Sequence, residues 1–99
     1  MNNITKVSEI TASDLAEYIR IDEPEDELQT LNNMLSVAKT FIVNYTGRAS
    51  EELDSFSDFV IAVFVLVQDM YDTRTLYVDK SNLNKVVETI LGLHRVNLL

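Results

Sequence analysis

The chain has 99 residues, no cysteine, one histidine and a formal net charge of −8. This length suits one domain and is too short for two. Without cysteine there is neither a disulfide framework nor a thiolate metal site, and one histidine leaves too few ligands for tetrahedral zinc. Two glycines cannot build a glycine-rich phosphate loop. The composition therefore excludes most metal-centred and nucleotide-binding chemistries.

The charges are distributed unevenly. Residues 1–30 contain eight acidic and two basic side chains, residues 50–72 contain six acidic and no basic ones, and residues 73–99 contain two acidic and four basic ones. Tight nucleic-acid binding needs clustered Lys and Arg, which the chain lacks. Most of the acids are expected on solvated helix faces, although acidic and basic ends of identical subunits can also meet. Because the N-terminal segment lacks the features of a secretory signal, we expect a cytoplasmic protein.

Two helices are predicted in the first half of the chain. A short helix is expected to end near residue 22, capped by Thr11 or Ser13. Pro24 suits the first turn of a long second helix, in which apolar residues recur at steps of three and four until Gly47 stops it. This second helix is expected to span about 22 residues, or roughly 33 Å.

The third predicted element is the most apolar part of the chain. Nine consecutive residues, 59–67, carry no polar side chain. This run is too short for a membrane span, which needs about 20 residues. Its β-branched residues would also suit a buried strand, but the absence of Gly and Pro over residues 55–73 and the three- and four-residue apolar steps favour a helix. A helix that is apolar all round must be buried all round, so the other elements are expected to wrap it. The expected centre of the core comprises Phe59, Val60, Val63, Phe64 and Val67.

The remaining elements are a link, a loop and a last helix. Residues 47–54 are expected to form a short polar link. Residues 75–79 have a strand-like composition but no partner strand, so we expect an extended loop. Ser81 or Asn82 can cap a final helix that ends near residues 92–94. The predicted fold is all-α: a four-helix single domain over residues 1–99, with a long second helix and a central buried third helix.

No chemical site is predicted. The acidic run 22–27 lacks the glycine and the ligand spacing of a calcium loop, and helix capping explains it better. Asp69 and Asp72 could in principle perform acid–base chemistry, but the neighbouring Arg74 offers an ion pair and favours a structural role. His94 is expected to be a charge partner at a helix C-terminus or a packing residue. We therefore expect no enzyme, no catalytic residue, no metal and no cofactor.

The order of these features resembles that of a known family. The matching segments are residues 10–22, the acidic entry 24–27, residues 38–39 and 44–48, the helix end 71–74 and the closing residues 93–95. In this order and at these separations they resemble the small head-tail connector, or adaptor, proteins of tailed bacteriophages. In the terms of this family, Tyr71 and Arg74 look like a retained structural pair at the end of the buried helix.

The resemblance implies an architectural function. Copies of the chain would close into a homo-oligomeric ring, joined above to the portal protein and below to a stopper or tail-completion protein. DNA would pass through the channel without specific binding, and no membrane would be involved. As a protein of a phage or prophage, the chain would then reside in the host cytoplasm during assembly and at the head-tail junction in the virion.

Two further expectations concern contacts and an alternative function. Loop residues Leu76, Tyr77 and Val78 are expected to contact neighbouring subunits or adjacent ring proteins, as is a tail formed by Val96, Leu98 and Leu99. The alternative for the tail is that it folds back onto its own core. The alternative function is a small acidic helical regulator or DNA mimic that binds a basic partner. A mimic needs its acids on one continuous face, whereas here they gather at predicted helix starts, which favours the architectural function.

Overall fold

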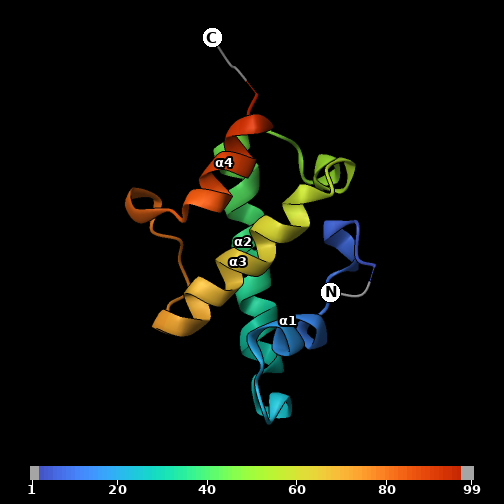
Figure 1. Ribbon diagram of the computed structural model, residues 1–99, viewed down its shortest axis with the longest axis vertical. Helices are drawn as coiled ribbons and strands as arrows, with labels where there is room; N and C mark the ends of the chain where they lie inside the picture. Colours follow the sequence, from blue (N-terminus) through green and yellow to red (C-terminus); the bar gives the residue numbers. More distant parts are fainter. Residues whose placement is uncertain (1–2, 97–99) are drawn as a thin grey trace.

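The computed structural model describes residues 3–96, which form four α-helices and four short 3₁₀ helices (Figure 1). No strand is present among these residues, so the all-α, four-helix prediction is confirmed. In chain order the elements are η1 (Val7–Glu9), α1 (Ala12–Ile19), η2 (Pro24–Asp26), α2 (Leu28–Thr46), η3 (Ser50–Ser55), α3 (Asp58–Thr73), η4 (Lys80–Asn82) and α4 (Lys85–Leu93). No helix within the described part is long and apolar enough to cross a bilayer.

The long helix α2 starts later than predicted. Pro24 opens the separate turn η2, in which the Glu27 N–H donates to the Pro24 carbonyl. The α-helical ladder begins only with the Leu31 N–H, which donates to the Glu27 carbonyl, so α2 has 19 residues. Its end is as predicted, because Gly47 takes up the left-handed conformation at φ 75° and its N–H donates to the Val43 carbonyl.

Side-chain caps determine the residues at which α1 and α4 begin. Thr11 caps α1 through a capping box in which its hydroxyl accepts from the Asp14 N–H and the Asp14 carboxylate accepts from the Thr11 N–H. The last helix begins at Lys85 instead of near residue 82, because the Asn84 side chain accepts from the N–H groups that follow it. The predicted caps at residues 81 and 82 instead belong to η4, which Asp79 caps.

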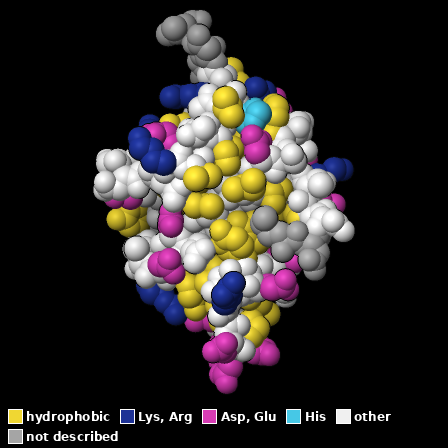
Figure 2. Space-filling view, viewed as in Figure 1, with side chains coloured by type: hydrophobic (Ala, Val, Ile, Leu, Met, Phe, Trp, Pro, Cys, Tyr) yellow, Lys and Arg dark blue, Asp and Glu magenta, His cyan; other side chains and the backbone are white. Residues whose placement is uncertain are grey.

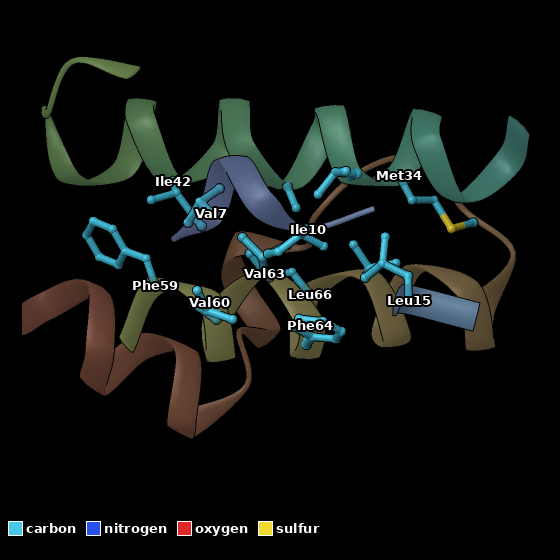
Figure 3. Close-up of a cluster of buried hydrophobic side chains, with 14 of the residues drawn as sticks. Val7, Ile10, Leu15, Met34, Ile42, Phe59, Val60, Val63, Phe64 and Leu66 are labelled. Carbon is cyan, nitrogen blue, oxygen red and sulfur yellow. The ribbon is translucent and has the colours of Figure 1, made fainter. Parts of the chain in front are cut away.

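Two short segments contribute to the core although the sequence pattern predicts no helix in either of them. The link after α2 forms η3, whose Leu53 is buried. The turn η1 and the residue that ends it place Val7 and Ile10 in the core. Figure 3 shows these two side chains between α2 and α3. Both segments were missed because three to six residues are too few to show a periodic apolar pattern.

The core forms where α3 crosses α2, and α1 and α4 pack on α3 as well (Figure 1). In Figure 3 the Met34 and Ile42 side chains of α2 point toward the apolar face of α3. The structure places the five residues expected at the core centre in this cluster, where each is at most 2% exposed: Phe59, Val60, Val63, Phe64 and Val67.

The expectation that α3 is buried on every side is wrong for one strip of the helix. Ile61 is 43% exposed and Val65 is partly exposed. The two residues are four apart and therefore share one face. This strip stays open because α2, α1 and α4 cover the other sides of the helix. Figure 2 shows the resulting hydrophobic band, which runs over α4, α3 and α1.

Replacing Phe64 tests the packing of α3. Phe64 is 1% exposed, and its ring meets that of Tyr18 with centroids 5.0 Å apart. Phe64→Ala should lower the free energy of unfolding by about 3 to 5 kcal/mol, because it removes a fully buried aromatic side chain. Ile61→Ala, on the open strip of the same helix, should cost less than about 1 kcal/mol. Urea unfolding monitored by circular dichroism measures both, and equal losses would contradict this description of the core.

Candidate interaction surface

The segment between α3 and α4 projects two large apolar side chains into solvent. We call residues 74–84 the arch loop. Leu76 is 53% exposed and Tyr77 is 62% exposed, whereas Val78 is half-buried and packs against the core. At the start of the loop the Thr75 N–H donates to the Met70 carbonyl, and η4 supports its other end. The loop is therefore ordered and exposes two apolar side chains. We call Leu76 and Tyr77 the crest of the arch loop.

Only some of the residues predicted as contact residues lie together. Leu76, Tyr77 and Val78 share the arch loop, but Val96 lies at the end of α2, where its N–H donates to the Thr46 carbonyl over 2.8 Å. At Val96 the chain thus bonds to its own domain. Leu98 and Leu99 lie outside the described residues.

Two hollows flank the crest of the arch loop. The first, which we call the α2 groove, has a volume of about 290 Å³ and lies between α2 and the arch loop. The second, which we call the α3 hollow, has a volume of about 330 Å³ and lies between the C-terminal half of α3 and the arch loop. Tyr77 and Val78 line both hollows. The α2 groove is lined by Ser36, Val37, Thr40, Phe41, Asn44, Leu76, Tyr77 and Val78.

The α3 hollow has both apolar and acidic residues in its lining. Leu66 and Met70 are buried, and Asp69, Asp72 and Asp79 contribute three carboxylates. Partial burial, and then the charge of Asp72, raise the pKa of Asp69. The hydrogen bond from the Asn82 side chain lowers the pKa of Asp79. Asp69 and Asp72 do not form an ion pair with Arg74.

Arg74 instead bonds to a residue at the start of α2. Its guanidinium donates to the two Glu27 carboxylate oxygens over 3.3 and 3.4 Å and to the Tyr71 hydroxyl over 3.2 Å. The Tyr71 hydroxyl donates to Glu27 over 3.3 Å, and the Arg74 guanidinium lies 4.2 Å from the centre of the Tyr71 ring. The Arg74 backbone N–H donates to the Met70 and Tyr71 carbonyls in the left-handed conformation, at φ 55°. Tyr71 and Arg74 therefore fasten the end of α3 to the start of α2.

A second cluster joins the other ends of the helices. His94 Nε2 lies 2.9 and 3.0 Å from the two carboxylate oxygens of Asp58, and the imidazole stacks on Phe56 with centroids 4.1 Å apart. Arg48 Nε donates to the His94 carbonyl over 2.7 Å, and its guanidinium pairs with Glu52 over 3.0 Å. His94 thus hydrogen-bonds to Asp58 and packs against Phe56, so the expected packing role is confirmed.

Most of this second cluster could not be predicted from the sequence. His94 and Asp58 are 36 residues apart, and Arg48 and His94 are 46 apart. Charged and aromatic residues at such separations show no periodic pattern, so their meeting depends on how the helices pack. Thr46 lies beside the cluster, and its buried hydroxyl donates to the Ile42 carbonyl. The cluster is a structural joint between α2, α3 and α4.

The arch loop is the most distinctive surface of the described part of the chain. Within residues 3–96 no group of three or more His, Cys, Asp or Glu side chains is placed to hold a metal ion. Asp69 and Asp72 are neighbours on α3, and Arg74 pairs with Glu27 instead of with either of them. The arch loop, in contrast, exposes the two apolar side chains of its crest beside an uncharged groove. We therefore treat the arch loop and its hollows as the candidate functional surface.

A test of the first joint uses the Tyr71 hydroxyl. Tyr71→Phe removes its bond to Glu27 and one acceptor of Arg74, and should lower the free energy of unfolding by about 1 kcal/mol. In a Glu27→Ala background the same change should cost much less, because the hydroxyl no longer has that partner. Tyr77→Phe is the matched control, since Tyr77 is exposed and its hydroxyl makes no hydrogen bond within residues 3–96. Urea titration of the four variants decides, and strictly additive losses would contradict the proposed joint.

The Asp69 carboxyl should make stability depend on pH. Its folded-state pKa is raised, so its contribution favours folding most below its unfolded-state pKa and is lost as the pH rises through the folded-state pKa. Asp69→Asn should therefore raise the melting temperature at pH 7, and the gain should vanish below about pH 3. Asp79→Asn should lower the melting temperature at pH 7, because the pKa of Asp79 is lowered in the folded state. Thermal melts at the two pH values check both, and a lower melting temperature for Asp69→Asn at pH 7 would refute the assignment.

Comparisons with known proteins add no relative to this description. No family model matches the chain, and neither the curated proteins nor the solved structures gave a match.

Proposed function

We propose that the chain is a structural subunit of a phage or prophage head-tail connector ring, which bridges the portal and the tail-completion or stopper protein around the DNA channel. The observation that carries the proposal is the arch loop, which holds Leu76 and Tyr77 more than half exposed on an ordered support. Exposed apolar groups with a polar surround are typical of protein contact sites. In this proposal the chain is not an enzyme, and it needs no cofactor.

The four-helix fold supports a subunit of this kind. The domain measures 46 × 29 × 19 Å, so it is elongated and presents distinct ends to its neighbours. Contacts at both ends of α3 link it to the neighbouring helices: Arg74 with Glu27 at one end and His94 with Asp58 at the other. A subunit of a ring must keep its contact surfaces in a constant relative orientation, because each error repeats at every interface.

The charge also suits a channel through which DNA slides. Net negative charge repels the phosphate backbone, so DNA would pass without being held. The exposed acids of residues 22–26 gather at one end of the molecule, whereas a DNA mimic would need them along one continuous face. This placement supports the connector over the acidic regulator.

Light scattering after size-exclusion chromatography, combined with electron microscopy of the chain alone and with the portal protein of the same phage, tests the proposal. A closed ring with a central channel, free or on the portal, is the expected result. A chain that stays monomeric in the presence of the portal, and instead forms a stoichiometric complex with a basic DNA-binding protein, would overturn it in favour of the regulator.

Variants of the arch loop test whether its crest makes the contacts. Leu76→Ser should weaken ring formation by about tenfold or more, because burial of such a side chain contributes about 1.5 to 3 kcal/mol to an interface. The monomer should keep its melting temperature, since Leu76 is exposed. Val86→Ser is the matched control: Val86 is 52% exposed, close to the 53% of Leu76, but lies on α4. If both substitutions weaken the ring equally, or if neither does, the arch loop is not the contact surface.

A further inference from the structure

Two basic side chains gather over one aromatic ring near the α2 groove. The Lys80 ammonium lies 5.6 Å from the centre of the Tyr45 ring, and the Arg95 guanidinium lies 5.0 Å from it. Neither side chain forms a salt bridge within residues 3–96. In a chain with a net charge of −8, these two cations form a local patch of opposite sign. We call Tyr45, Lys80 and Arg95 the basic patch.

The basic patch is continuous with the α2 groove. The ring of Phe41, which lines the groove, lies 5.5 Å from that of Tyr45. No charged side chain lines the groove, although acids outnumber bases two to one in the chain. Asp79, the acid next to Lys80, lines the α3 hollow and accepts hydrogen bonds from Ser81 and Asn82. The groove and the patch together form a neutral apolar surface with a basic edge.

The same chain carries a complementary surface at its other end. We call residues 22–26 the acidic tip: it consists of the turn η2 and the two residues before it. Asp22, Glu23, Glu25 and Asp26 are exposed there, around a half-buried Pro24. Two bases lie near the tip: Arg20 precedes it in the chain, and Arg74 is paired with Glu27, the residue that follows it. Figure 2 shows these acidic side chains at one end of the molecule, and Figure 1 places η2 there, far from η4.

We infer that the acidic tip of one copy docks on the α2 groove of a second copy, with its carboxylates against Lys80 and Arg95. Opposite charges at the rim of an interface steer association and exclude wrong orientations, and the uncharged groove allows apolar burial beside them. This inference rests on the proposed ring, for which it names the two surfaces that neighbouring subunits bring together.

The contact is heterologous, because it joins two different surfaces. Each subunit therefore has one free tip and one free groove, and the contact repeats from copy to copy. Such a contact produces a ring when the rotation between subunits closes. Because the charges lie at the exposed rim, the association should weaken as salt shortens the Debye length from about 10 Å at 0.1 M.

A charge-swap experiment tests the pairing directly. The groove variant is Lys80→Glu with Arg95→Glu, and the tip variant reverses all four exposed acids of the tip: Asp22→Lys, Glu23→Lys, Glu25→Lys and Asp26→Lys. Alone, each variant presents like charges on its two surfaces, and its self-association should fall by about tenfold or more. When the two variants are mixed, the acidic groove of one faces the basic tip of the other, so association should return. Sedimentation velocity at low ionic strength measures all of these states.

The groove variant needs a control with the same change in net charge at another place. Lys6→Glu with Lys85→Glu provides it, because both side chains are exposed and neither lies at the basic patch or the tip. This variant should associate like the wild type. Circular dichroism of each variant shows whether it is folded. Should the groove variant be unfolded, Lys80→Gln with Arg95→Gln replaces it, and its association should likewise fall.

The outcomes separate this inference from the proposed function. If association returns in the mixture and the control variant associates like the wild type, the docking of the acidic tip on the α2 groove is supported. A mixture that stays monomeric while the wild type associates, or a wild type that stays monomeric at about 1 mM, overturns it. If both folded variants still form closed rings on the portal, the inference fails while the connector function stands. If the wild type forms no ring with the portal, the proposed function itself fails.

Discussion

Removal of the apolar segment 59–67 from water is the constraint on which the rest of the structure depends. A domain of this size has a single modest core, so each helix must contribute to covering this segment. The apolar stripe of α2 meets it along one side, and α1, α4 and the turn η1 cover the others except the strip that carries Ile61 and Val65. The joints at the two ends of α3 then hold the covering helices in place. The arch loop has its position because α3 ends at one of these joints.

The helices themselves could be predicted because their signals are local. Apolar steps of three and four, Gly47 at the end of α2 and the capping box at Thr11 all act within one or two turns. The boundaries were less predictable where two local solutions compete. Pro24 can open either a 3₁₀ turn or an α-helix, and Asn84 competes with Ser81 as a cap, at differences of about 1 kcal/mol or less.

The joints could not be predicted, because they connect residues that are distant in sequence. Arg74 has Asp69 and Asp72 as near neighbours in the chain, yet its partner is Glu27, 47 residues away. The choice depends on the crossing of α3 over α2, which no local pattern specifies. The candidate surface was predicted only in part for the same reason. The exposed crest could be predicted, because the loop is apolar and has no partner strand. The groove and the basic patch could not, because they depend on where Phe41 and Tyr45 lie once the helices have packed.

Two apolar surfaces remain open, and their charges distinguish them. The band over Ile61 and Val65 lies on a helix that carries Asp69 and Asp72 and belongs to a segment without any basic residue. Two copies that met band to band would bring acidic rims together, and like charges across an interface disfavour it. The α2 groove is uncharged and is bordered by cations, so a copy that approaches with its acidic tip meets attraction instead. In a protein with a net charge of −8, charge thus favours a contact between two different surfaces over one that pairs a surface with itself, and a contact between two different surfaces can extend beyond a dimer.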